Sequence, residues 1–279
     1  MKRPSNLLLA LTLLCLGSQA MPAHADELAE KGRAIFARSQ HAVVTVSIVL
    51  KITYSSSGQS AAPRESKQEA TGTVIDPSGL TVLALSACDP ADIYQRMDSR
   101  YKIETEVSDL KILLADGTEL PAEIVLRDKD LDLAFIRPKT KPASPMIAVD
   151  LTKSAPAQVL TEVVALNRLN SAASRAYSAS VERISAVVQK PRTFYIPDST
   201  MSTTTMGSPA FLMNGDVLGI FVMRAVSSSG GQANLTGIIL PADDVLKGAK
   251  QAPEAKSDAE KKDEPKEPAK DSKAAAEKK

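Results

Sequence analysis

The stretch from Asp198 to Ile220 holds the residues of this chain that could carry a nucleophilic reaction. Ser208 lies in it, and a serine hydroxyl forms an acyl-enzyme once a base has taken its proton. Met206, two residues earlier, has a thioether with no proton to give up. The only histidine beyond residue 25 is His41, which precedes the first expected strand. Ser208 therefore has no evident base, and we interpret it either as a displaced nucleophile or as a turn residue before Pro209.

Cys88 is the one cysteine outside the expected leader, so the mature chain can form no internal disulfide. Its thiol is open to two interpretations: a reactive group that pairs between chains, or a small buried residue. We expect no cofactor and no metal.

A strong hairpin signal follows Ser208. Apolar runs at Ala210–Met213 and Val217–Met223 flank Asn214-Gly215, a dipeptide that supplies the positive φ angles of a two-residue type I′ turn. The methionines and phenylalanines of this region, Met206, Phe211, Met213, Phe221 and Met223, fit either ordinary core packing or an adaptable apolar groove.

The same alternation of short apolar runs and turn residues extends over most of the chain. Asp26–Ser39 has helical spacing, Tyr54–Ala70 is polar and is expected to be a long exposed loop, and Asp76-Pro77-Ser78-Gly79 is a good turn sequence. Expected strands are Ala42–Ile52, Thr71–Ile75, Leu80–Leu85, Lys111–Leu114, Leu120–Leu126, Leu131–Ile136, Val159–Leu166, Ser178–Val188, Thr193–Ile196 and Leu235–Leu240. This spacing predicts an all-β sandwich or a pair of barrels.

Both ends differ in composition from the middle. Residues 1–25 resemble a cleaved signal peptide, with Lys2 and Arg3, an apolar stretch too short to span a bilayer, and Ala23-His24-Ala25 as the cleavage site. Residues 251–279 hold eight Lys against eight Asp and Glu, with no Leu, Ile, Val or aromatic residue, and are expected to be a disordered charged tail. Residues 26–250 remain for the folded domain. Without Lys2 and Arg3 the formal charge falls from +1 to −1, and no basic surplus points to nucleic acid.

Four segments resemble HtrA/Deg-type trypsin-like serine proteases, in the order of that family. Asp198–Ile220 is similar to the nucleophile segment, which has Gly-Asn-Ser-Gly-Gly-Pro before a strand, a turn and Gly-Ile. Gly72–Leu80 resembles the strands before the catalytic histidine, Leu114–Ile136 the stretch with the catalytic aspartate, and Gly237–Pro241 the closing strand. The resemblance covers most of Ala42–Val245 and implies a two-barrel trypsin/chymotrypsin-like fold. No segment resembles the PDZ domain that often follows.

The resemblance also implies where the catalytic residues would lie. The aspartate falls on Asp132, the histidine position on Ser86, and the nucleophile position on Met206. Asp132 is then either a catalytic relic or a structural acceptor for Ser86 and nearby backbone N–H groups.

The oxyanion loop departs from the family pattern as well. Thr204 stands where that loop needs glycine, Gly207 survives, and Ser208 replaces the second glycine. A triad depends on histidine to take and return the proton, and no replacement base stands at a matching position.

Three functions follow as hypotheses. The first is an exported pseudoprotease, periplasmic or extracellular, that acts as a binding, chaperone-like or regulatory module. Its partner would be a protein or peptide, either an active HtrA-like protease or unfolded envelope proteins, and it could form homo-oligomers. The second is a serine endopeptidase with a rearranged site built from Ser208, or from Ser86 with Asp132. A third hypothesis is a structural envelope protein whose tail carries the function. No transmembrane segment is expected in the mature chain.

Overall fold

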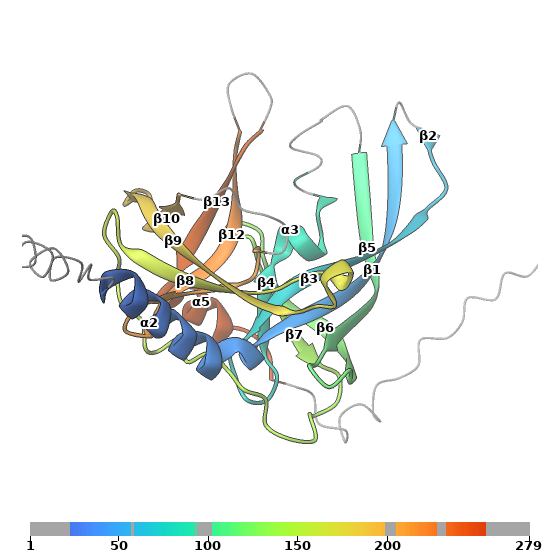
Figure 1. The fold of residues 1–279 in the computed structure, drawn as a ribbon. Coiled ribbons are helices and arrows are strands. Elements are labelled where there is room, and N and C mark those ends of the chain that lie inside the picture. The colour runs from blue at the N-terminus through green and yellow to red at the C-terminus, as the bar shows by residue number, and fades with distance from the viewer. Residues whose placement is uncertain are drawn as a thin grey trace, which may run out of the picture.

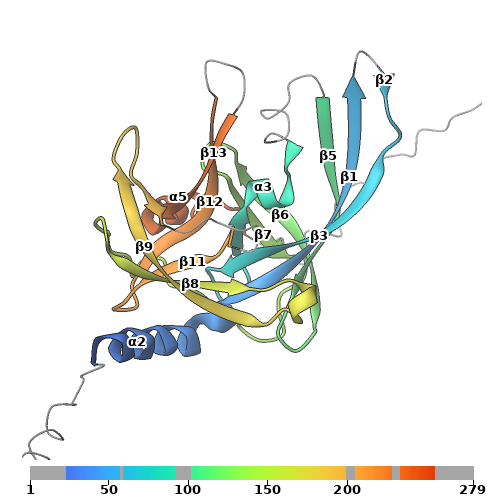
Figure 2. The same cartoon turned by 45° about the horizontal axis from the view of Figure 1, so that its top comes forward.

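Strands are the main regular elements of the described chain. In the computed structural model, residues 23–56, 59–91, 93, 102–198, 205–227 and 233–254 are described. Most of the expected signal peptide and tail therefore lies outside the described residues. Figures 1 and 2 show two barrels side by side, with α2 along the outside of one of them.

The first barrel is built from the N-terminal half of the chain. Its strands are β1 (Val43–Ser56), β3 (Arg64–Val74), β4 (Thr81–Ala84), β5 (Lys102–Leu113), β6 (Glu119–Asp128) and β7 (Leu133–Pro138). They are ordered β1-β3-β4-β7-β6-β5, and pairing of β1 with β5 closes the ring. The short β2 (Gln59–Ser60) adds to the end of β1, and α3 (Leu85–Cys88) follows β4 directly.

The second barrel is built from the C-terminal half. Its strands are β8 (Glu162–Arg168), β9 (Tyr177–Val188), β10 (Phe194–Pro197), β11 (Pro209–Leu212), β12 (Val217–Ser227) and β13 (Ala233–Pro241), closed in the order β10-β13-β12-β11-β8-β9. The 3-10 turn η2 (Ser171–Ala173) joins β8 to β9. The predicted two-barrel trypsin-like fold is confirmed.

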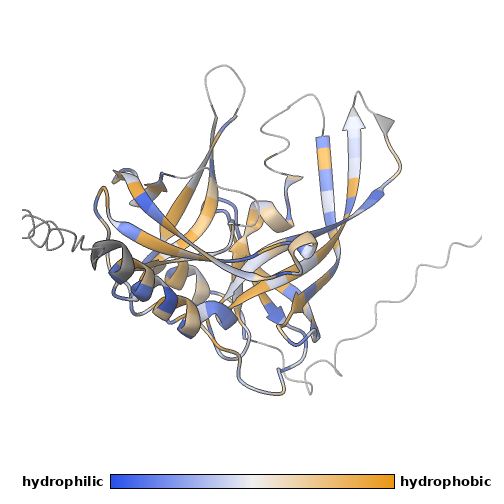
Figure 3. Cartoon of the chain, viewed as in Figure 1, coloured by the Kyte–Doolittle hydropathy of each residue, from blue (hydrophilic) through white to orange (hydrophobic). Residues whose placement is uncertain are grey.

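Alternating side chains of these strands form three apolar clusters. One fills the first barrel and includes Ile48 and Ile136, and another fills the second barrel and includes Leu218 and Phe221. The third lies between the barrels, where Phe135 meets residues of β8, β11 and β12. Figure 3 shows the same division, with hydrophobic colour concentrated on the strands where they cross.

Two helices cover the outside of this core. The helix α2 (Ala23–Ser39), followed by the 3-10 turn η1 (Gln40–Ala42), lies against β8 and β9 of the second barrel (Figure 2). It buries Ile35, while α5 (Ala242–Ala249) buries Val245 in the cluster between the barrels. The helix α2 begins at Ala23, before the start expected at Asp26.

The expectation of a long exposed loop at Tyr54–Ala70 is wrong. β1 continues to Ser56, β3 begins at Arg64, and the two pair antiparallel with Ile52 opposite Arg64. The other edge of β1 pairs with β5 over the same length. Backbone hydrogen bonds form a ladder whatever the side chains are, so the polar β3 pairs with β1, and β1 is itself paired with β5 along its other edge.

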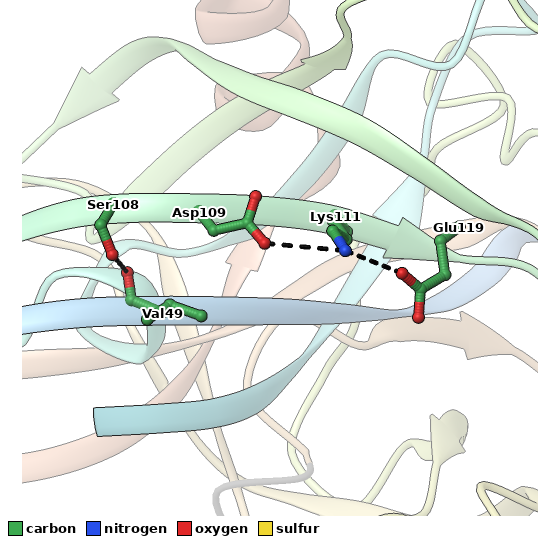
Figure 4. A network of polar contacts seen from close by, with 5 residues as sticks. All are labelled: Val49, Ser108, Asp109, Lys111 and Glu119. Carbon is green, nitrogen blue, oxygen red and sulfur yellow. Dashed lines mark hydrogen bonds and ion pairs between the residues drawn. The ribbon is translucent and has the colours of Figure 1, made fainter. Parts of the chain in front are cut away.

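Polar contacts also join the strands β1, β5 and β6. In Figure 4 Ser108 Oγ donates to the Val49 carbonyl at 3.1 Å, and Lys111 Nζ lies 2.9 Å from Glu119 and 3.8 Å from Asp109. Exposed ion pairs contribute only about 0–1 kcal/mol each. The backbone ladder and the buried stripe of β1 therefore set the register.

The predicted type I′ turn at Asn214-Gly215 is also wrong, although the hairpin forms. Gly215 has φ 87°, but Asn214 is not among the residues with positive φ. The Gly215 N–H donates to the Leu212 carbonyl at 2.8 Å, and the Leu212 N–H donates to the Asp216 carbonyl at 2.9 Å. This is the longer hairpin connection in which a turn is followed by a single left-handed glycine and a bulge.

Candidate functional site

Strand pairing in the first barrel brings Ser86 and Asp132 together. β4 runs antiparallel to β7 with Ala84 opposite Leu133, so the residues just after β4 and just before β7 must meet. The Leu85 N–H donates to the Asp132 backbone carbonyl at 2.9 Å, which joins the start of α3 to this point. The side chain of Ser86 then faces the carboxylate.

Three donors reach the carboxylate of Asp132. The Ser86 N–H lies 2.6 Å from Oδ1, and the Ser86 Oγ hydroxyl lies 2.9 Å from Oδ2. The Met223 N–H donates to Oδ2 at 2.7 Å from β12, in the second barrel. Through these hydrogen bonds the carboxylate of Asp132 contacts both barrels.

The backbone conformation of Asp132 and the pKa of its carboxyl are both unusual. Its φ is 56°, in the left-handed region that aspartate visits more readily than most residues. Its side chain is 8% exposed. Burial raises the pKa of Asp132 from 3.8 to about 6, although the hydrogen bonds from Met223 and Ser86 oppose that rise.

Met206 and Gly207 lie in the turn that leads into β11. The side chain of Met206 is 4% exposed, and it does not line the cleft beside Asp132. Gly207 has φ 87°, and a Cβ built there would lie 2.1 Å from the Thr71 carbonyl oxygen. The Gly207 N–H donates to the Phe221 carbonyl at 2.8 Å, and its own carbonyl accepts the Thr73 hydroxyl at 2.7 Å. Thr204 lies outside the described residues.

Ser208 is fully buried. Its Oγ donates to Asn167 Oδ1 on β8 at 2.6 Å. Its N–H donates to the Thr205 carbonyl at 3.1 Å, and its carbonyl accepts the Phe221 N–H at 3.0 Å. These contacts fix Ser208 inside the second barrel, away from solvent.

A cleft of about 330 Å³ opens beside Ser86 and Asp132, between the two barrels. Its apolar lining includes Leu85, Phe194, Met223, Ile238 and Leu240, and its charged lining consists of Asp89, Lys129, Asp130, Asp132, Arg192 and Arg224. Sequence analysis missed Phe194, Arg192 and Arg224. Their only sequence signal is that Arg224 directly follows the apolar run of the β12 hairpin.

The remaining candidate residues lie elsewhere. His41, in η1, is exposed, and its Nδ1 is 3.2 Å from the Tyr177 hydroxyl. Cys88 is completely buried and donates to the Leu85 carbonyl at 3.4 Å, and burial raises its pKa to about 12. A thiol so rarely ionised is a poor nucleophile.

Within the described ranges, no group of three or more His, Cys, Asp or Glu side chains could hold a metal ion. Over the same part of the chain, no helix has the length and apolar character needed to cross a bilayer.

Comparison with known proteins agrees with this fold. Residues 70–220, just over half of the chain, match the family model for the trypsin-like peptidase domain. No curated protein matches the sequence.

Two solved structures are similar to this one. One is the MamO protease domain from Magnetospirillum magneticum in its apo form, at 17% identity and TM-score 0.47, covering 76% of this chain and 97% of that one. The other is the HtrA-type protease AlgWS227A with tripeptide, at 14% identity and TM-score 0.50, covering 79% of this chain and 62% of that one. At such identities the likeness concerns the fold alone.

Proposed function

Because the chain belongs to the trypsin-like peptidase domain family, we propose that it is a pseudoprotease. It keeps the fold, does not cleave peptides, and acts as a binding, chaperone-like or regulatory module. The contact between Ser86 and Asp132 carries this proposal. The Ser86 hydroxyl donates a hydrogen bond to Asp132 Oδ2 at 2.9 Å. In a catalytic triad the aspartate would bind an imidazole instead. A hydroxyl cannot accept and return a proton near neutral pH as an imidazole does.

The nucleophile region supports the same conclusion. Met206 offers a buried thioether, which cannot form an acyl-enzyme. Ser208 is 0% exposed, and its Oγ donates to an amide oxygen, which is no general base. A substrate carbonyl could reach Ser208 only if the start of β11 moved.

The cleft supports a binding role. It remains open beside Asp132, and Met223 and Arg224 of β12 line it. An extended segment could bind there by β-strand addition, in which main-chain hydrogen bonds supply the affinity. We propose a peptide or protein as the ligand, either an unfolded envelope protein or an active HtrA-like relative.

Two further proposals concern the ends of the chain. Residues 1–25 direct export to the periplasm or the extracellular space and are removed. The charged tail expected at 251–279 follows a folded unit that extends past residue 250, because Ala252 packs into the cluster between the barrels and the Pro253 carbonyl accepts a hydrogen bond from Arg137 Nε at 2.8 Å. Sequencing the N-terminus of the exported protein tests the first. A mature protein that begins at Asp26 would support it, and one that keeps residues 1–25 would contradict it.

A specific observation favours a second candidate function. Ser86 lines an open cleft, and its hydroxyl contacts a carboxylate whose pKa is near 6, which is the range of a useful general base. A serine endopeptidase that uses Ser86 as nucleophile and Asp132 as base is therefore the alternative.

A digest of unfolded casein separates the two. We expect no sustained cleavage by the mature protein, nor by its Ser86→Ala and Ser208→Ala variants. Cleavage that Ser86→Ala abolishes would establish the alternative. Cleavage that Ser208→Ala abolishes would mean that β11 moves to expose a displaced nucleophile.

A further inference from the structure

The two walls of the cleft carry charges of opposite sign. The second barrel contributes Arg192, between β9 and β10, and Arg224 on β12. The first barrel contributes three carboxylates, Asp89, Asp130 and Asp132, and one cation, Lys129. Carboxylates therefore gather on one side of the cleft and guanidinium groups on the other.

Arg224 is held in place by an aromatic ring. Its Cζ lies over the Phe194 ring, 4.9 Å from the ring centroid, and Phe194 is a buried residue, 7% exposed. A guanidinium group stacked on a ring still has its N–H donors free in its own plane, where they match the two oxygens of a carboxylate.

Neither arginine of this wall has an ion pair within the part of the chain that the structure describes. Other arginines do: Arg175 pairs with Glu69 and Arg183 with Glu162. On the opposite wall, Asp89 accepts a hydrogen bond from Thr105 and lies 3.9 Å from Arg127. The acidic wall is thus partly neutralised by its own barrel, while the two arginines face the cleft with their charges available.

We propose that this cleft binds a peptide through a carboxylate group, which Arg224 and Arg192 hold against the second barrel. The carboxylate is an Asp or Glu side chain or the C-terminus of the peptide, and apolar side chains beside it contact Met223, Ile238 and Leu240. This inference rests on the proposed binding function and names its ligand class. The acidic first-barrel wall repels the same carboxylate and so fixes the orientation of the peptide.

Four fluorescein-labelled hexapeptides of leucine and alanine test the proposal by fluorescence anisotropy with the mature protein. The first has a free C-terminal carboxylate, the second is amidated, the third is amidated and contains one glutamate, and the fourth has glutamine in its place. We expect the peptides that have a carboxylate to bind about 10-fold or more tightly than their neutral counterparts, because hydrogen bonds to a charged group are worth about 1.5–3 kcal/mol. The first and third peptides distinguish a terminal source from a side-chain source.

Matched variants locate the effect. Arg224→Gln and Arg192→Gln should each reduce the preference for the carboxylate, whereas Arg64→Gln, an exposed arginine on β3, should leave it unchanged. Circular dichroism checks that each variant is folded, and the exposed Arg192 provides a readout if Arg224→Gln does not fold.

Other outcomes are equally informative. Equal binding of all four peptides, or a preference that survives both arginine variants, would overturn the carboxylate inference and leave a peptide-binding pseudoprotease. No binding of any peptide at millimolar concentration would overturn both. Cleavage of the bound peptide would overturn the pseudoprotease proposal while leaving carboxylate recognition in place.

Discussion

Replacing Asp132 by asparagine should change how the stability of the protein depends on pH. Burial raises the pKa of this carboxyl from 3.8 to about 6, so the folded state binds the proton more tightly than the unfolded state does. Asp132 therefore contributes stability that is fully present below its unfolded pKa and is lost as the pH rises through its folded pKa. One pKa unit corresponds to about 1.4 kcal/mol, so the whole contribution of Asp132 to the free energy of unfolding is about 3 kcal/mol. Roughly 2 kcal/mol of this contribution is lost between pH 4 and pH 7.

Urea unfolding of the natural chain and of Asp132→Asn at pH 4 and pH 7 measures this. In the folded natural chain this carboxyl is protonated at pH 4 and charged at pH 7, whereas every other effect of the substitution is taken as the same at both pH values. The free energy of unfolding of the variant relative to the natural chain should therefore rise by roughly 2 kcal/mol from pH 4 to pH 7. Asp76→Asn is the control, because hydrogen bonds from Ser78 lower the pKa of Asp76 and the difference should move in the opposite direction. A difference for Asp132→Asn that stays constant with pH, or falls, would refute the reasoning.

Three further perturbations probe the same region. Gly207→Ala should destabilise the fold by about 2 kcal/mol or more, since φ is 87° and the new Cβ meets the Thr71 carbonyl at 2.1 Å; an unchanged melting temperature would contradict this. Cys88 should react with iodoacetamide only after unfolding, because it is buried and has a pKa of about 12; rapid labelling of the native protein, read by mass spectrometry, would show that the thiol is accessible. Ser86→His should lower the pKa of Asp132, because an imidazolium beside a carboxylate favours its charged form; carboxyl titration by NMR checks this, and an unchanged or raised pKa would contradict it.

The sequence predicted the two barrels because alternating apolar residues and turn signals determine strands locally. The prediction of a loop failed at Tyr54–Ala70, because backbone hydrogen bonds of β1 to β3 and β5 form a sheet there despite the polar side chains. The prediction of a type I′ turn also failed, because Gly215 has positive φ and Asn214 does not.

The site was predictable only in part. Ser86 and Asp132 could be paired from sequence, because the family pattern places them after β4 and before β7. The third donor, the Met223 N–H, comes from the other barrel, so only the packing of the two barrels reveals it. Arg192 and Phe194 reach the cleft for the same reason, and no local pattern marks them.

The central claim is that this chain has no activated serine, and a fluorophosphonate probe tests it most directly. Such a probe forms a covalent adduct with a serine hydroxyl that a base has activated. Intact-mass spectrometry of the mature protein after incubation with the probe should show the unmodified mass alone. An adduct mapped to Ser86 or Ser208, absent after unfolding, would contradict the account and identify a working nucleophile.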